Sequence, residues 1–96
     1  MFNKKYRIEF GRKIFSRESY NCIMDTISYV PAGPEMQCLY KIQEEIPFTV
    51  LDTDLKGCTG NHITIKCKKK DIDKIYYIFM MATQDILIDM SLKETY

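Results

Sequence analysis

The sequence has no long hydrophobic run and no secretion signal. Its longest uninterrupted apolar stretch, Ile75–Ala82, is much shorter than the roughly 18 residues that a membrane-spanning helix needs. Residues 1–7 carry several charges and are followed by no apolar region, so a signal peptide is not expected. The sequence therefore predicts a soluble, cytoplasmic protein with no membrane partner.

Internal repeats, low-complexity stretches and linkers are also missing. The composition, 46% hydrophobic and 28% charged residues, is typical of a globular protein rather than of a disordered chain. A chain of 96 residues is long enough to bury a core without a metal or a disulfide. We expect one domain over residues 1–96, with a disordered tail at about 92–96.

Catalytic motifs are missing as well. The sequence contains no G-x-S-x-G, no Walker loop and no G-x-G-x-x-G. Its one histidine, His62, could pair with Cys58, but no third group is implied that would orient the imidazole. Because carboxylates can perform acid–base chemistry without a motif, the sequence leaves enzymatic activity open while favouring a non-enzymatic protein.

The patterns of metal-binding residues are incomplete. The four cysteines are Cys22, Cys38, Cys58 and Cys67. They lack the close C-x-x-C type of spacing found in zinc sites, and without a secretion signal they are expected to be free thiols. The segment Asp52–Gly57 begins like a calcium loop, but Lys56 and Ile63 stand where oxygen ligands are required. We therefore expect no metal and no cofactor.

Alternation of apolar and polar residues predicts strands at 4–10 and 62–68, and two further short strands are expected at 48–51 and 86–90. In the strand at 62–68, Ile63, Ile65 and Cys67 are expected to point inward. Gly57 and Gly60 mark a loop over 52–61.

Two helices are expected. The first begins after a capping serine, Ser16 or Ser19, and ends before Pro31. Its apolar side chains recur with helical spacing and are Tyr20, Ile23, Met24 and Ile27. The second helix begins near Asp71, and its buried stripe consists of Ile72, Ile75, Tyr76, Phe79 and Thr83.

Residues 35–46 match the periods of both a strand and a helix. Alternate residues of this segment are apolar, as in a strand. Pro34 would instead suit the first turn of a helix. Because Glu44 and Glu45 would oppose the negative end of a helix dipole, we favour a strand.

The expected order of elements is β-α-β-β-(β)-α-β, which places the protein in the α+β class. The simplest architecture with this order is a ferredoxin-like split βαβ sandwich. It consists of an antiparallel sheet with both helices on one face.

The second helix carries apolar residues outside its buried stripe. Tyr77 and Met81 lie on the opposite side, where a surface helix is normally polar. Either both are buried within the monomer, or they form a partner surface, for which tyrosine and methionine are enriched residue types. Tyr77 and Met81 are therefore the candidate partner-binding residues.

The net charge is only +1, but lysines cluster locally. Lys66, Lys68, Lys69 and Lys70 lie within five residues, where a strand passes into a helix, and could pair with phosphates. The expected open face of the sheet carries no aromatic side chains on which bases could stack. Nucleic-acid binding is therefore the alternative hypothesis rather than the leading one.

The leading hypothesis is a small non-enzymatic interaction module that binds, and inhibits or regulates, a larger protein. Thirteen isoleucines and eleven lysines beside two alanines indicate an AT-rich gene. Short, near-neutral proteins from such genomes include inhibitors of host or defence proteins encoded by phages and mobile elements. A homodimer is a further arrangement that the sequence permits. The alternative is a nucleic-acid-binding or regulatory ferredoxin-like module that uses the basic patch Lys66–Lys70.

Overall fold

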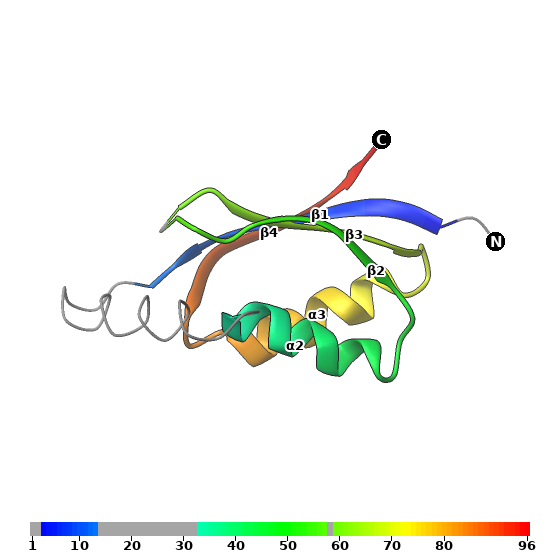
Figure 1. Cartoon of the computed structure of the whole chain (residues 1–96), viewed down its shortest axis with the longest axis horizontal. Coiled ribbons are helices and arrows are strands. Elements are labelled where there is room, and N and C mark those ends of the chain that lie inside the picture. Colours follow the sequence, from blue (N-terminus) through cyan, green and yellow to red (C-terminus); the bar gives the residue numbers. More distant parts are fainter. Residues whose placement is uncertain (1–2, 14–32, 58) are drawn as a thin grey trace.

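The computed structural model describes residues 3–13, 33–57 and 59–96. Within these ranges the chain forms four strands and two helices, labelled as in Figure 1: β1 (Asn3–Arg12), α2 (Gly33–Gln43), β2 (Thr49–Asp54), β3 (Asn61–Lys68), α3 (Ile72–Thr83) and β4 (Leu87–Thr95). The first expected helix, from Ser16 or Ser19 to Pro31, lies outside the described residues.

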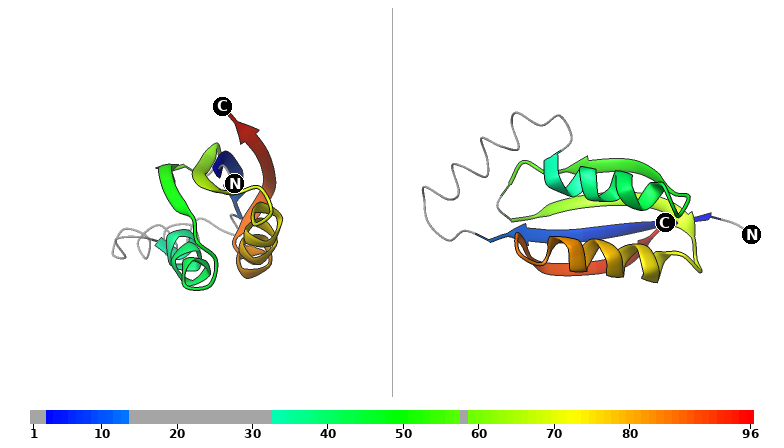
Figure 2. Two further views of the ribbon diagram at one scale, coloured as in Figure 1. Left: turned by 90° about the vertical axis from the view of Figure 1, so that its right-hand side faces the viewer. Right: turned by 90° about the horizontal axis from the view of Figure 1, so that it is seen from below.

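The strands form one antiparallel sheet in the order β2-β3-β1-β4. Both helices lie against the same face of this sheet, with α2 on the β2 side and α3 on the β4 side (Figure 2). No other described element covers the opposite face, which we call the open face. The α+β class expected from the sequence is confirmed.

The hydrophobic core lies between the sheet and the helices. Ile8 of β1 and Ile63 of β3 are cross-strand neighbours, and both are fully buried. Leu39 extends from α2 into the same core. Phe79 of α3 places its ring 6.1 Å from that of Phe10 at an interplanar angle of 56°, a tilted arrangement that aromatic quadrupoles favour.

Strands β2 and β3 and helix α3 lie close to their expected positions. Strand β2 extends beyond the expected 48–51 to Asp54, so the following loop is shorter. The inward residues of β3 are those predicted, namely Ile63, Ile65 and Cys67. The buried residues of α3 are Ile72, Ile75, Phe79 and Thr83, and Tyr76 is half-buried.

The strand that we favoured for residues 35–46 is wrong, because this part of the chain forms α2. Pro34 lies in the first turn, where its missing N–H would have no intrahelical partner in any case. Glu35 in the same turn interacts favourably with the positive end of the helix dipole. Glu44 and Glu45 directly follow the last helical residue and still oppose the negative end of the dipole, but both are exposed to solvent, where this cost is small.

Strand β4 is longer than the sequence predicts. We expected a strand over 86–90 and a tail over 91–96, but the pairing of β4 with β1 continues as far as Lys5 and Thr95. Asp89 adopts a positive φ of 55°, which interrupts the regular strand geometry. The longer strand provides partners for backbone N–H and C=O groups of β1.

Candidate functional site

The outer side of α3 exposes two large apolar side chains, Tyr77 and Met81, which we call the α3 face. Tyr77 is 59% exposed and Met81 is 44% exposed. They lie one turn apart, on the side of the helix opposite Ile75 and Phe79, which are fully buried against the sheet. The structure therefore places both residues at the surface of the described part of the chain, rather than in a second core.

A groove of about 500 Å³ lies between the two helices, and we call it the helix groove. Its lining residues come from α2, from the turn that follows it and from α3: Pro34, Gln37, Cys38, Lys41, Ile42, Glu45, Ile78 and Ala82. Ile78 and Ala82 directly follow Tyr77 and Met81, so they lie about 100° round the same helix. The α3 face and the helix groove are thus neighbouring parts of one surface.

The four lysines at the junction of β3 and α3 are joined by a fifth from β1. The register of the sheet places Lys5 directly opposite Lys66. Lys68 ends β3, and Lys69 and Lys70 lie in the turn before α3. None of these five residues, which we call the lysine cluster, forms an ion pair with another described residue. Like charges directly opposite one another destabilise a sheet, so the Lys5–Lys66 pair carries a cost that a bound anion would reduce.

A chain of polar contacts that the sequence did not predict crosses the open face. His62 Nε2 lies 3.1 Å from Asp52 Oδ2, and His62 Nδ1 lies 3.2 Å from Arg7 Nη2. Arg7 Nε and Lys93 Nζ each lie 2.9 Å from Glu9 Oε1. The hydrogen bond from Lys93 is the main reason why the pKa of Glu9 lies below its usual value. These contacts connect all four strands and give His62 a structural role.

The described strands offer no platform for stacking bases on the open face. The aromatic rings in the described strands besides that of His62 belong to Tyr6 and Phe10, which are buried on the helix-covered face. His62 itself is held between Asp52 and Arg7. A bound nucleic acid would therefore contact this face through charges and hydroxyl groups rather than through stacking.

The candidate zinc ligands are not brought together. His62 lies on the open face, whereas Cys67 is buried on the other face of the same strand. Burial raises the pKa of the Cys67 thiol to about 11. Cys38 is a free thiol on α2, and Cys22 and Cys58 lie outside the described residues. Across residues 3–13, 33–57 and 59–96, no group of three or more His, Cys, Asp or Glu side chains is placed to hold a metal ion.

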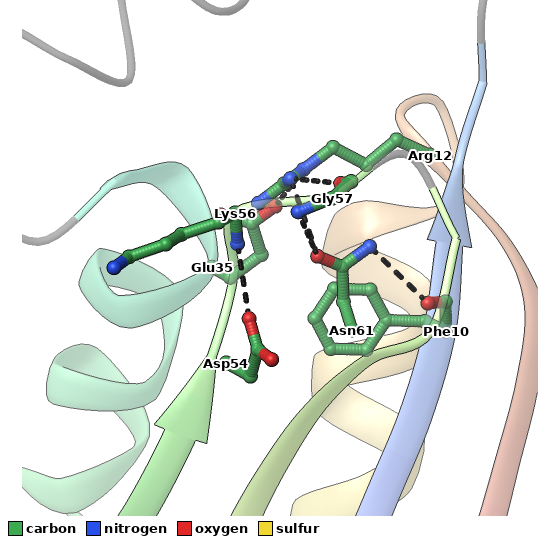
Figure 3. A network of polar contacts seen from close by, with 7 residues as sticks. All are labelled: Phe10, Arg12, Glu35, Asp54, Lys56, Gly57 and Asn61. Carbon is green, nitrogen blue, oxygen red and sulfur yellow. Dashed lines mark hydrogen bonds and ion pairs between the residues drawn. The ribbon is translucent and has the colours of Figure 1, made fainter.

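The segment that begins like a calcium loop forms the end of β2 and a short turn. Asp52 contacts His62 across the sheet. Asp54 Oδ1 accepts a hydrogen bond of 3.4 Å from the backbone N–H of Lys56, which closes the turn (Figure 3). The acidic side chains of this segment therefore serve the sheet and the turn.

A buried polar network joins the end of β1 to α2 and to the loop before β3 (Figure 3). Arg12 Nε lies 3.1 Å from Glu35 Oε1, and Arg12 Nη1 donates to the carbonyl oxygen of Gly57 at 2.6 Å. Asn61 accepts a hydrogen bond from Gly57 N and donates one to the carbonyl oxygen of Phe10. Because Arg12, Glu35 and Asn61 are all buried, this network positions the helix and the loop.

The sequence contained one signal for this network. Tyr6, Ile8 and Phe10 occupy every second position of β1, and Arg12 is the next residue in that series. Extending the strand past Gly11 would have predicted that Arg12 points inward and needs a buried acidic partner. The identity of that partner, Glu35, depends on the tertiary structure.

None of the helices in the described ranges is long and apolar enough to cross a membrane. Comparison of the chain with known protein families, with characterised proteins and with solved structures finds no significant match. The function is therefore inferred from the surfaces of the molecule itself.

Proposed function

We propose that this protein is a small non-enzymatic interaction module that binds a larger protein through the α3 face and the helix groove. The observation that carries this proposal is the exposure of Tyr77 and Met81 on the outer side of α3. Both residue types are enriched at protein interfaces, and tyrosine is among the commonest hot-spot residues. Two side chains alone cover much less than the roughly 800 Å² that each partner of a stable complex buries, so the helix groove would supply additional area.

The chemistry of the helix groove suits a protein partner. Ile78 and Ala82 provide apolar surface, and the exposed Lys41 and Glu45 provide opposite charges beside it. An apolar centre with a polar rim is the usual anatomy of an interface. The two opposite charges favour a partner segment that carries an acidic and a basic residue.

The strand order supports the finer proposal of a ferredoxin-like split βαβ sandwich. Strands β1 and β2 are each antiparallel to β3, which lies between them, so they run parallel to each other. A pair of parallel strands split by a third is the defining arrangement of that fold. Among the described residues, no further strand pairs with the two edges of the sheet.

We further propose that the partner is a host or defence protein in the cytoplasm, and that the complex inhibits or regulates it. The abundance of isoleucine and lysine supports a gene from an AT-rich genome of a phage or mobile element. A homodimer through the same surface is the competing arrangement, and light scattering on the purified protein distinguishes the two.

The double variant Tyr77→Glu with Met81→Glu tests the proposal. Both side chains are exposed, so we expect an unchanged circular dichroism spectrum and the loss of the complex. A photo-crosslinking amino acid at position 77, introduced in the source cells, identifies the partner, and binding is then measured with the purified partner. Ile88→Glu is a matched control, because Ile88 is an exposed apolar residue (39%) that lies on β4, outside the α3 face and the helix groove. Full affinity in the double variant would overturn the proposal, and lost helicity would show that the two residues are buried.

Nucleic-acid binding at the lysine cluster is the second candidate function. It is favoured by one observation, the direct opposition of Lys5 and Lys66 without an ion pair in the described residues. Replacing Lys68, Lys69 and Lys70 by glutamate should abolish such binding, and added salt should weaken it steeply because bound phosphates release counterions. Because the open face lacks stacking residues, we expect little binding at physiological salt. A sub-micromolar complex in a gel shift at that salt would make this the leading function.

A further inference from the structure

We infer that a groove between β2 and α2 binds an extended peptide segment of a partner protein, which adds to the sheet as a further strand beside β2. We call this site the β2 groove. It lies on the side of α2 away from the helix groove, and it uses neither Tyr77 nor Met81. The inference therefore goes beyond the proposed function and does not depend on it.

Strand β2 is an edge of the sheet. In the order β2-β3-β1-β4 its one neighbour is β3, so its outward N–H and C=O groups have no strand partner among the described residues. An edge of this kind is a template for a further strand, and main-chain hydrogen bonds then provide much of the affinity. The six residues of β2 span about 20 Å, which suits a ligand of similar length.

The β2 groove offers side-chain pockets as well as a backbone edge. It has a volume of about 660 Å³ and is lined by Met36, Tyr40 and Gln43 of α2 and by residues 49–53 of β2. Tyr40 is 50% exposed and Leu51 is 45% exposed, so each presents apolar surface to this groove. The register with β3 shifts between Val50 and Asp52, which leaves Leu51 without a cross-strand neighbour. A strand edge beside a helix and exposed apolar side chains matches the known mode of strand addition, in which alternate ligand side chains enter pockets.

The opposite edge of the sheet, β4, is less suited to strand addition. Asp89, the third residue of β4, has a positive φ of 55°, and a left-handed residue within a strand disturbs the regular spacing of outward N–H and C=O groups there. The described residues of β2 show no positive φ. Strand β2 has an irregularity of its own, the register shift between Val50 and Asp52, but it lies beside the β2 groove, so it is the better template.

The charges near the two ends of β2 suit an antiparallel ligand with a defined order of charges. Asp52 and Asp54 are exposed near the end of the strand. Thr49, at its start, lies opposite Lys66 of the lysine cluster. An antiparallel ligand places its N-terminal residues beside Asp52 and Asp54 and its C-terminal residues beside Thr49, with Lys66 one strand further away on β3. The ligand that fits is a peptide with basic residues first, alternating aliphatic residues in the middle and an acidic residue last.

The test uses the full chain and the synthetic peptide acetyl-Lys-Lys-Val-Thr-Ile-Thr-Glu-amide. Titration of the ¹⁵N-labelled protein, followed by NMR, should shift resonances of β2 and of α2 residues that line the β2 groove. Tyr40→Ser should weaken binding by about tenfold, which corresponds to the loss of an interface residue of moderate importance. Tyr77→Ser is the matched control, because it removes a similarly exposed tyrosine from the α3 face and should leave the affinity for the peptide unchanged.

Two control peptides separate strand addition from simple adhesion. Methylation of alternate backbone nitrogens removes main-chain donors and should weaken binding by at least about tenfold if the peptide pairs with β2. Exchange of the lysines and the glutamate reverses the charges and should also weaken binding, and the loss should diminish with added salt.

The inference would be overturned by the absence of shifts at millimolar peptide or by shifts confined to β4 or to the α3 face. It would also be overturned if the methylated peptide bound with equal affinity, or if the Tyr40→Ser variant bound the peptide with equal affinity. Shifts of β2 that depend on protein concentration without peptide would show that a second copy of the chain occupies the groove, and would also overturn it. If Tyr77→Glu with Met81→Glu left the larger complex intact, the proposed role of the α3 face would be wrong, but the inference about the β2 groove would not be affected.

Discussion

Arg12 and Glu35 form a buried ion pair that ties the end of β1 to the first turn of α2. Arg12 Nε lies 3.1 Å from Glu35 Oε1, and the two side chains are 4% and 1% exposed. Arg12 Nη2 and Glu35 Oε2 have no hydrogen-bond partner among the described residues. Each charge therefore depends on the other for compensation. Because α2 contributes to both the helix groove and the β2 groove, this pair helps to position both candidate binding surfaces.

Breaking this ion pair from one side should be strongly destabilising. We expect Glu35→Leu or Arg12→Met to lower the free energy of unfolding by about 3–5 kcal/mol, because each leaves a buried charge without its partner. The double variant should lose clearly less than the sum of the two single losses, because no unpaired charge remains. Urea denaturation of the four proteins measures this coupling. Additive losses would contradict the structural role that we assign to the pair.

Because of its contacts on the open face, Glu9 should titrate with a lowered pKa. Its pKa lies below the ordinary value of 4.5, chiefly because of the hydrogen bond from Lys93. Because the folded-state pKa lies below the unfolded value, ionised Glu9 stabilises the fold above the unfolded pKa, and this contribution is lost as the pH falls through the folded pKa.

The variant Lys93→Ala should raise the pKa of Glu9 toward its ordinary value, as measured by NMR titration of the side-chain carboxyl group. Lys5→Ala is a matched control, because Lys5 is an exposed lysine on the same face that pairs with no described carboxylate. An unchanged Glu9 pKa in Lys93→Ala would show that the contact does not persist in solution.

Several elements could be predicted from the sequence because their apolar periods are unambiguous. Strand β3 alternates without interruption, and the stripe of α3 repeats with helical spacing, so local sequence decides both. The same helical geometry predicted that Tyr77 and Met81 point away from the stripe. The segment that forms α2 fits both periods, and there the favourable first turn with Pro34 and Glu35 outweighed the alternation.

The remaining features depend on contacts between residues that are far apart in the sequence. The pairing of Lys5 with Lys66 follows from the register of β1 and β3, which local patterns do not fix. Residues 91–95 become a strand because β1 offers them an unpaired edge. Likewise, the β2 groove exists because the sheet order places β2 at an edge beside α2.

Cys67 should make the stability of the fold fall with increasing pH in the alkaline range. Burial raises the pKa of its thiol from 9.0 to about 11, so the unfolded chain releases this proton first. The contribution is fully present below pH 9.0 and is lost as the pH rises toward 11. Cys67→Val keeps an apolar residue in the core but cannot ionise. From pH of about 8 to about 10.5, the free energy of unfolding of the wild type should therefore fall by about 2 kcal/mol relative to that of this variant. Urea denaturation at both pH values measures this difference, and parallel changes in the two proteins would contradict it.

Phe79 and Tyr77 lie two residues apart on α3, and their truncation should affect the stability of the fold to very different extents. Phe79 is 0% exposed and packs against Phe10, so Phe79→Ala should lower the free energy of unfolding by about 3–5 kcal/mol. That loss is a large part of the roughly 5–15 kcal/mol that stabilises a typical domain. Tyr77 is 59% exposed, so Tyr77→Ala should change stability by no more than about 0.5 kcal/mol. Urea denaturation followed by circular dichroism measures both variants on the same helix. A loss in Tyr77→Ala comparable to that in Phe79→Ala would mean that Tyr77 belongs to a core, and the α3 face would then not be available to a partner.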